Sequence, residues 1–193
     1  MYDNLDDIQN ELISRLGRAA KDRRSAMHTP CVVTSDVDAR VMVLRDFDRA
    51  AWTLRFHTDT RAPKVGVIEA DPRMAVLFYD KSAKMQIRAR GIGRIERESP
   101  LARRAWDAGD NFARRCYLGA GPGTSSETPT SGLPPEFEGV EPTDEELTPA
   151  WENFAVLQIE IEQLDWLYLA HTGHVRARFD RAGDSWQGSW LSP

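Results

Sequence analysis

The stretch RVMVLRDFD, residues 40–48, has an arginine at position 40, another at position 45, and an apolar run between them. Alternate side chains of a strand share a face. This gives two sets of three: Arg40, Met42 and Leu44, and Val41, Val43 and Arg45. Both faces are mainly apolar, which predicts a strand covered on both sides within a sheet or barrel. A guanidinium group held near such a core needs an anionic partner, either a carboxylate or a phosphate.

Strand-like segments continue on both sides of this stretch. The four residues 36–39 separate it from a preceding apolar segment, a spacing typical of a β-hairpin. Residues 85–95 alternate apolar and polar side chains, as a half-buried strand does. The predicted strands are 29–35, 40–47, 52–58, 74–79, 85–95, 154–170, 174–179 and a short segment near 185–191.

The remaining segments favour helices and one long loop. Residues 5–19 place apolar side chains three and four positions apart, which predicts an amphipathic helix. Pro63 fits the first turn of a second helix, and Ser99, followed by a proline, fits the N-cap of a third. Residues 119–150 contain six of the eleven prolines. We therefore expect a long surface loop there.

The order of these elements favours one architecture. About seven or eight strands with few βαβ alternations indicate an antiparallel barrel rather than a doubly wound sheet. The predicted fold class is mainly β with peripheral helices. A chain of 193 residues can build one good core. We therefore predict a single domain, residues 1–193, with the Pro-, Gly- and acid-rich loop inserted at 119–150.

Composition and charge exclude several function classes. The net charge is -5, but seven acidic residues and no Lys or Arg lie in 119–150, which leaves the rest of the chain slightly positive. This excess is too weak for a general nucleic-acid binder, although it allows a local basic pocket. No apolar run is long enough to cross a bilayer, and the acidic start is unlike a secretory signal. We expect a cytoplasmic protein.

The sequence has no pattern typical of a metal site or a catalytic nucleophile. Cys31 and Cys116 are far apart, and the four histidines form no ligand motif. The glycine-rich stretches GIGRIE and GAGPGTSS do not match nucleotide-binding fingerprints. We therefore predict no metal and no catalytic side chain.

A short basic loop is a first candidate for anion binding. Residues 56–64, FHTDTRAPK, connect a predicted strand to a helix start and place Thr58, Arg61 and Lys64 together. Free amide groups and the helix dipole favour a phosphate at such a position. A solvated loop with two ordinary charges is the alternative.

Two strands carry a second kind of candidate, polar side chains on alternate positions. These are His174, Arg176 and Arg178 in one strand, and Gln86, Arg88 and Arg90 in the other. A solvated outer face would give the same pattern, although like charges side by side are mildly unfavourable. Trp166, within LDWLYL, is by itself more typical of a core residue than of a ligand contact.

Taken in chain order, these pieces resemble the pyridoxamine 5'-phosphate oxidase-like, FMN-binding split-barrel family, in its oxidase-related branch. The resemblance covers about residues 30–95 and 151–193. It rests on Arg40-Val-Met-Val-Leu44-Arg45, on His57-Thr58 followed by Arg61 and Lys64, on Gln86, on Trp166, and on His174 with Arg176, closing on Trp186 and WLSP.

The resemblance implies FMN as cofactor and a homodimer with FMN at the subunit interface. Arg40, Arg61 and Lys64 would neutralise the phosphate. His174 and Arg45 would face a small-molecule substrate. The implied cofactor-binding residues are Arg40, Val41, Met42, Val43, Leu44, Arg45, His57, Thr58, Arg61, Lys64, Gln86, Trp166 and Arg176, of which the last two would reach FMN from the partner subunit.

Departures from the family pattern leave alternatives open. The family's Arg-Lys pair is replaced here by Pro63-Lys64, so Arg61 substitutes from two residues earlier or that contact is absent. The residues that hold the substrate phosphate in the oxidase have no clean equivalents, and the family's C-terminal arginine aligns with Thr172. The sequence thus predicts an FMN-dependent oxidoreductase, with a non-catalytic flavin-binding or carrier module as the alternative. A third hypothesis, a nucleic-acid-binding barrel, would need a basic face with interleaved aromatic side chains, and the net charge counts against it.

Overall fold

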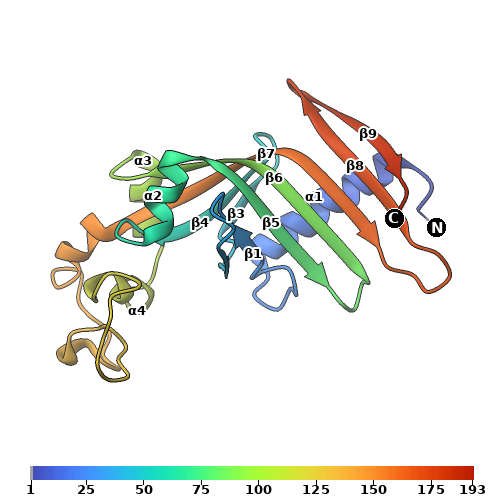
Figure 1. The fold of residues 1–193 in the computed structure, drawn as a ribbon. Helices are drawn as coiled ribbons and strands as arrows, with labels where there is room; N and C mark the ends of the chain where they lie inside the picture. The colour runs from blue at the N-terminus through green and yellow to red at the C-terminus, as the bar shows by residue number, and fades with distance from the viewer. Residues whose placement is uncertain (1) are drawn as a thin grey trace. The chain divides into compact units, whose positions relative to one another are not determined.

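The computed structural model describes residues 2–193 and shows a mostly antiparallel β-sheet with a few helices (Figure 1). The strands within this range are β1 Cys31–Val33, β2 Ala39–Val41, β3 Asp46–Asp48, β4 Thr53–Asp59, β5 Arg73–Asp80, β6 Met85–Glu96, β7 Phe154–Tyr168, β8 Val175–Ala182 and β9 Ser185–Leu191. The α-helices are α1 Leu5–Lys21, α2 Pro63–Ala70, α3 Pro100–Asp107 and α4 Asn111–Arg114, and the short 3₁₀ helices are η1 Arg115–Leu118, η2 Pro135–Phe137 and η3 Thr148–Asn153. The predicted fold class, mainly β with peripheral helices, is confirmed.

The strands form one sheet in the order β2-β1-β5-β6-β7-β4-β3, and β8 and β9 extend it from β7. The pairings of β1 with β2, β1 with β5, and β5 with β6 are antiparallel, as are those of β7 with β8 and β8 with β9. The hairpin predicted around residues 36–39 is confirmed as β1–β2. Neighbouring strands thus place residues that are far apart in sequence on the same sheet face.

The chain divides into two compact units. The first contains the described residues of Met1–Phe56, together with Asp71–Gly93 and Gln158–Pro193, and the second contains His57–Ala70 and Arg94–Leu157. Each unit has its own group of buried apolar side chains. A single domain over residues 1–193, with the loop insertion at 119–150, stays a prediction.

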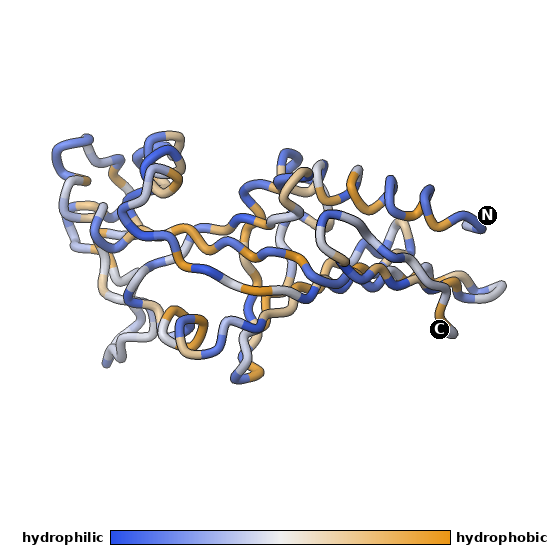
Figure 2. The backbone as a smooth tube through the Cα atoms, turned by 90° about the horizontal axis from the view of Figure 1, so that it is seen from above, coloured by the Kyte–Doolittle hydropathy of each residue, from blue (hydrophilic) through white to orange (hydrophobic). Residues whose placement is uncertain are grey.

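Helix α1 belongs to the first unit and forms as its sequence predicts. The Asn4 side chain caps the helix by accepting a hydrogen bond from the Asp6 amide at 2.8 Å. Ile8, Leu12 and Leu16 are completely buried. Figure 2 shows the matching alternation of hydrophobic and hydrophilic residues along the helix. This stripe therefore covers part of the inner sheet face.

The prediction of one continuous strand over residues 40–47 is wrong. Strand β2 ends at Val41 and β3 begins at Asp46, because the intervening backbone changes partners. The Leu44 amide bonds to the His28 carbonyl at 2.9 Å, whereas the next amide, of Arg45, bonds to the Arg55 carbonyl in β4 at 2.8 Å. The sequence pattern of residues 40–47 does not show that the backbone changes its pairing partner within this stretch.

The prediction that both faces of this stretch are covered is also wrong. Leu44 is completely buried, but the Val41 side chain is 68% exposed. The alternation expected in residues 85–95 is confirmed, since Met85, Ile87 and Ala89 of β6 are buried while the side chains between them lie toward solvent. The first unit therefore has a buried inner sheet face and an outer face that carries polar and some apolar side chains.

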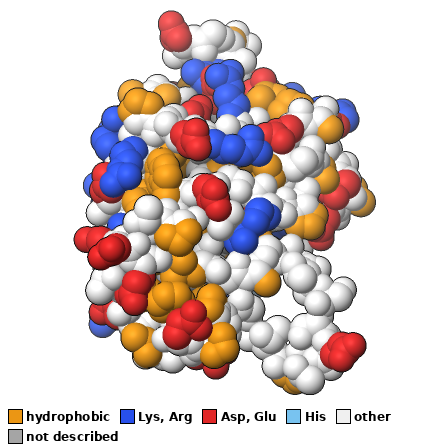
Figure 3. All heavy atoms as spheres, turned by 90° about the vertical axis from the view of Figure 1, so that its left-hand side faces the viewer, with side chains coloured by type: hydrophobic (Ala, Val, Ile, Leu, Met, Phe, Trp, Pro, Cys, Tyr) orange, Lys and Arg blue, Asp and Glu red, His pale blue; other side chains and the backbone are white. Residues whose placement is uncertain are grey.

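The second unit packs around Trp106 of α3. The Ser99 hydroxyl caps α3 by accepting a hydrogen bond from the Ala102 amide at 3.2 Å, as its sequence predicts. Trp106 packs edge-on against Phe154 and Trp151, with ring centroids 5.3 and 5.7 Å apart. On the face drawn in Figure 3, basic and acidic side chains lie around exposed hydrophobic ones. This surface therefore has mixed charge.

The loop 119–150 is mainly irregular, as expected, but it is fastened at several points. Arg115 donates two hydrogen bonds to the carbonyls of Phe137 and Val140, at 2.8 and 3.0 Å. Thr143 and Glu146 bond reciprocally through side chain and amide, which is a capping box.

Among the described residues, no helix combines the length and apolar character needed to cross a membrane.

Candidate functional site

Arg40 has an anionic partner, and that partner belongs to the chain itself. Its guanidinium forms an ion pair with Asp38, two residues earlier, and donates to the Thr34 hydroxyl at 3.0 Å. The Asp38 side chain is 67% exposed while that of Arg40 is 21% exposed. Because Asp38 is largely solvated, its ion pair with Arg40 contributes little to stability.

The solvent exposure of the side chains varies along residues 41–45, the stretch predicted to bind the flavin ring. Val41 is exposed, Met42 and Val43 are half-buried, Leu44 is buried, and Arg45 is exposed. Only part of this segment can therefore offer side chains to a ligand. Residues 42–45 lie between β2 and β3, outside the regular strands.

Gln86 lies on the outer sheet face beside exposed apolar side chains. In the sheet register Val41 pairs with Cys31, and Cys31 pairs with Leu77. Gln86 pairs with Tyr79, which is 48% exposed. Directly paired residues of neighbouring strands point to the same face. The structure therefore brings the Gln86 amide next to an apolar surface.

Asp165 of β7 links two of the arginines singled out in the sequence. It accepts a hydrogen bond from Arg88 Nη2 at 2.6 Å and from Arg176 Nη2 at 2.7 Å, and Arg176 Nε approaches both carboxylate oxygens at 3.2 Å. Burial raises the pKa of the Asp165 carboxyl, but the bonds from Arg176 and then Arg88 outweigh it, so the pKa lies below its ordinary value. Asp165 is thus a charged anchor between β6 and β8.

Trp166 is a core residue of this chain. It is completely buried, and its ring packs edge-on against Tyr2 with centroids 4.6 Å apart. Its indole Nε1 is buried and has no hydrogen-bond partner within residues 2–193, which is unusual for a tryptophan. A contact with a cofactor would require Tyr2 to move aside.

His174 and Arg178 lie at the polar side of β8. His174 immediately precedes β8 and is exposed. Arg178 donates to Asp180 at 2.8 Å, while Ala177 and Phe179 on the other face are buried. The facial alternation predicted for HVRARF is therefore confirmed.

The second unit contains the basic loop, and an aspartate organises it. Asp59 is 8% exposed and accepts hydrogen bonds from the Arg61 amide, Nε and Nη2, at 2.8, 3.0 and 2.7 Å. Arg61 Nη1 donates to the Gly119 carbonyl at 3.0 Å. The side-chain bond to Asp59 raises the pKa of Arg61. Arg61 thus fastens the start of α2 to the start of the long loop.

The other predicted residues of this loop lie close by. Thr58 is buried, and the His57 ring packs edge-on against Phe154 with centroids 5.0 Å apart. Lys64 is half-buried in the first turn of α2. The structure therefore brings His57, Thr58, Arg61 and Lys64 together within one strand–loop–helix connection.

The carboxylates are the residues that the sequence interpretation missed. Asp38-x-Arg40 and Asp59-x-Arg61 share the same spacing, which could have indicated ion pairs between near neighbours. Asp165 gave no such signal. Its partners lie 77 and 11 residues away, so only the strand order reveals the contact.

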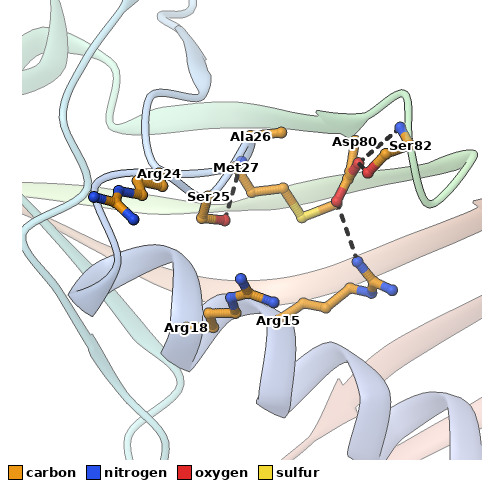
Figure 4. A pocket seen from close by; sticks show the side chains of 8 residues that line it. All are labelled: Arg15, Arg18, Arg24, Ser25, Ala26, Met27, Asp80 and Ser82. Atoms are coloured by element: carbon orange, nitrogen blue, oxygen red, sulfur yellow. Dashed lines mark hydrogen bonds and ion pairs between the residues drawn. The ribbon is translucent and has the colours of Figure 1, made fainter.

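A separate cavity of about 190 Å³ lies between α1, the loop after it and the β5–β6 turn (Figure 4). Arg15 reaches from α1 to Asp80 at 3.4 Å and also pairs with Glu11 at 2.7 Å. The Ser82 hydroxyl and amide donate to Asp80, and the hydroxyl bond is the main reason why the pKa of Asp80 is lowered. The charges of this cavity are therefore largely neutralised by its own side chains.

No group of three or more His, Cys, Asp or Glu side chains within residues 2–193 is arranged to hold a metal ion.

Comparison with a family model gives an independent assignment for the N-terminal half. Residues 12–96 match the model described as pyridoxamine 5'-phosphate oxidase, FMN-binding domain. This range includes the stretch 40–48, the basic loop 56–64 and Gln86. The matched segment therefore contains most of the cofactor residues that the resemblance implies.

Curated and solved proteins extend the similarity to the whole chain. The pyridoxine/pyridoxamine 5'-phosphate oxidase of Caulobacter vibrioides is 26% identical over 195 residues, which cover 95% of this chain and 82% of that protein. A pyridoxamine 5'-phosphate oxidase-related, FMN binding protein from Nostoc punctiforme superimposes with a TM-score of 0.75 and 20% identity, covering all of both chains.

A third structure is PhzG from Burkholderia lata in complex with tetrahydrophenazine-1-carboxylic acid. It has a TM-score of 0.67 and 16% identity, and covers 96% of this chain and 92% of that one. At these identities the solved structures establish the fold alone. The resemblance seen in the sequence is thereby confirmed: residues 12–96 match the FMN-binding domain of pyridoxamine 5'-phosphate oxidase, and the chain has the split-barrel fold of proteins related to that oxidase.

Proposed function

We propose that this protein binds FMN and acts as a flavin-dependent oxidoreductase on a small molecule, related to pyridoxamine 5'-phosphate oxidase. The observation that carries the proposal is the match of residues 12–96 to an FMN-binding domain, because that range contains Arg40, Lys64 and Gln86. Bound FMN would supply hydride or electron transfer. The side chains would bind, orient and exclude water, and no protein nucleophile is needed.

The phosphate of FMN would lie against Arg40. The solvated partner Asp38 would give way to the phosphate, whose higher charge makes the stronger charge-assisted bonds. Lys64, in the first turn of α2, is the loop cation that we assign to a phosphate, as the family resemblance implies, together with Thr58 and His57 at the end of β4. Free amides at a helix start support this position.

Arg61 has a different environment from Arg40. Its guanidinium is held by the buried Asp59 and by a carbonyl of the long loop. Removing a guanidinium from a buried carboxylate is costly. This favours the alternative in which the family's arginine contact is absent and Arg61 maintains the shape of the loop that presents Lys64.

The ring system would lie along residues 41–45, with the Gln86 amide as a hydrogen-bonding partner. The half-exposed side chains of Met42 and Val43 suit a flat apolar ligand, and Leu44 fixes the segment to the core. Arg45 and His174 are both exposed, which supports their proposed place beside the substrate.

We also propose a homodimer in which the outer face of β1, β2 and β5 is the contact surface. Val41, Leu77 and Tyr79 are 68%, 38% and 48% exposed, and register relations connect them across neighbouring strands. An exposed apolar patch of this kind is typical of an interface. Arg176 of one subunit would then reach the FMN of the other, and Trp166 would join it after displacement of Tyr2.

The first experiment is the visible absorption spectrum of the purified protein before and after addition of FMN, with chromatography of any released cofactor. We expect a flavin spectrum and released FMN. A colourless protein that also ignores added FMN would refute the proposal.

A second experiment separates turnover from storage. Reduction of the bound flavin is followed anaerobically after addition of pyridoxine or pyridoxamine phosphate. Rapid bleaching by either compound would exclude the alternative of a non-catalytic carrier. Stable absorbance with both would exclude the biosynthetic oxidase activity and turn the search to other reductants.

A further inference from the structure

The outer face of β6, β7 and β8 contains a cavity that lacks Arg40 and Lys64, the proposed contacts of the FMN phosphate, and that shares only Arg176 with the proposed FMN site. Its volume is about 190 Å³, and four arginines line it: Arg88, Arg90, Arg176 and Arg178. Two come from β6 and two from β8, and Asp165 of β7 lies between them. All of these residues belong to the first unit.

The carboxylates at this cavity do not balance its arginines. Asp165 is shared by Arg88 and Arg176, and Asp180 pairs with Arg178. Four guanidinium groups therefore face two carboxylates. The formal charges of these side chains leave an excess of about two positive charges. Like charges on one face of neighbouring strands repel each other, so the arrangement is stabilised when an anion enters.

Two guanidinium groups have hydrogen-bonding capacity left over. Arg88 Nε is buried without a hydrogen-bond partner among the described residues, and a buried unsatisfied donor of this kind is costly. Arg90 is exposed and has no ion pair or side-chain hydrogen bond within residues 2–193. Both side chains point to the same face of β6, because they are two residues apart in the strand.

We propose that this cavity binds a small oxyanion, a phosphate or the phosphate group of a small monoester. Guanidinium groups suit tetrahedral oxyanions because they can donate paired hydrogen bonds. A cavity of about 190 Å³ is smaller than those that enclose drug-sized ligands, about 300–1,000 Å³. It therefore accommodates one anionic group and not a nucleotide.

The cavity drawn in Figure 4 provides an internal contrast. It has the same volume and three arginines among its lining residues, yet Arg15 there is paired with both Glu11 and Asp80, and Arg18 is paired with Asp22. Two of its three arginines are thus paired with carboxylates. The excess of positive charge distinguishes the cavity on β6–β8.

The test is calorimetric titration of FMN-saturated protein with inorganic phosphate at constant ionic strength. FMN keeps its own phosphate site occupied, so the heat reports a different site. Arg90→Gln and Arg178→Gln should each weaken phosphate binding by about tenfold or more, the size expected for loss of a bond to a charged group. Arg103→Gln, which removes an arginine paired with Asp107 on α3, should leave it unchanged.

Each outcome of the phosphate titration either supports or overturns the proposal. Absence of phosphate binding at millimolar concentration, or equal weakening by Arg103→Gln, would overturn it. If the protein does not retain FMN, the same titration with Arg40→Gln separates the two ideas. Binding that survives Arg40→Gln but not Arg90→Gln supports this cavity even where the FMN proposal fails. Tighter binding of glycerol 3-phosphate than of phosphate would identify a monoester, and the reverse would identify free phosphate.

Discussion

Arg40 and Arg73 occupy matched local settings with different expected roles. Each is paired with an aspartate two residues earlier, Asp38 and Asp71 respectively. We predict that Arg40→Glu raises the FMN dissociation constant at least about tenfold, because a carboxylate would replace the cation beside the phosphate. Arg73→Glu should change it little. Fluorescence titration of the apoprotein with FMN measures both, and equal affinity of the Arg40 variant and the parent would remove Arg40 from the site.

The lowered pKa of Asp165 predicts how the free energy of unfolding depends on pH. Its pKa is lowered in the folded protein, so its stabilising contribution is present above the ordinary pKa of about 3.9 and is lost as pH falls through the lower folded value. We expect Asp165→Asn to reduce the unfolding free energy at pH 7 by about 1–2 kcal/mol, allowing for the partial exposure of both arginines.

Urea unfolding at several pH values tests this prediction. The difference between the parent protein and Asp165→Asn should shrink below about pH 4, as the carboxyl protonates first in the unfolded chain and then, at lower pH, in the folded protein. A difference that stays constant from pH 7 to pH 3 would show that the charge of Asp165 is not what stabilises the pair. Asp107→Asn, in an exposed pair with Arg103 on α3, is the control and should have little effect at any pH.

At the scale of elements, Gly91 fixes the distance between β6 and β7. A Cβ atom at this position would collide with the backbone carbonyl of Glu160, which cannot move without breaking the sheet. We predict that Gly91→Ala destabilises the protein by about 2 kcal/mol or more, within the range for overpacking. Gly66→Ala is the matched control. Its Cβ would meet no atom within 4 Å, and alanine favours the helix.

Thermal unfolding of the two glycine variants distinguishes them directly. Gly91→Ala should lower the midpoint, and Gly66→Ala should leave it unchanged or raise it. Equal midpoints would show that the backbones of β6 and β7 can separate without loss of stability.

Several elements could be predicted from the sequence because their signals are local. The helix over Leu5–Lys21, the cap at Ser99 and the alternation in β6 depend on residues within one or two turns or strands. The break between β2 and β3 could not be predicted, since residues 42–45 keep an apolar alternation while their amides change partners from Pro30 and His28 to Arg55. A local sequence pattern indicates that a segment favours a strand. Which neighbouring segment its amides bond to is decided by the whole sheet.

The candidate site shows the same division. Residue types and chain order were sufficient for the resemblance that the family model confirms. Which arginines are already engaged was not predictable. Arg61 is committed to Asp59 and Gly119, and Arg176 to Asp165, through contacts that span up to 58 residues. Sequence thus indicated which cations are present, and the structure indicates which of them retain capacity for an anion.

At the scale of the whole molecule, the proposed homodimer connects the outer sheet face with cofactor binding. Val41 and Leu77 are both aligned with Cys31 in the strand register, so a charge at either position would lie within the same exposed patch. We predict that Val41→Asp and Leu77→Asp each convert the dimer to a monomer, because an unpaired carboxylate buried at an apolar interface is strongly unfavourable. Light scattering coupled to size-exclusion chromatography measures the mass.

The matched control is Val37→Asp, since Val37 is 86% exposed in the turn between β1 and β2. It introduces the same charge beside the patch and should leave the dimer intact. If the dimer supplies Arg176 to the neighbouring FMN, the two monomeric variants should also release flavin during chromatography, whereas Val37→Asp should retain it. A monomer that keeps its flavin would refute the shared site but not the interface. A dimer that persists in both variants would place the interface elsewhere.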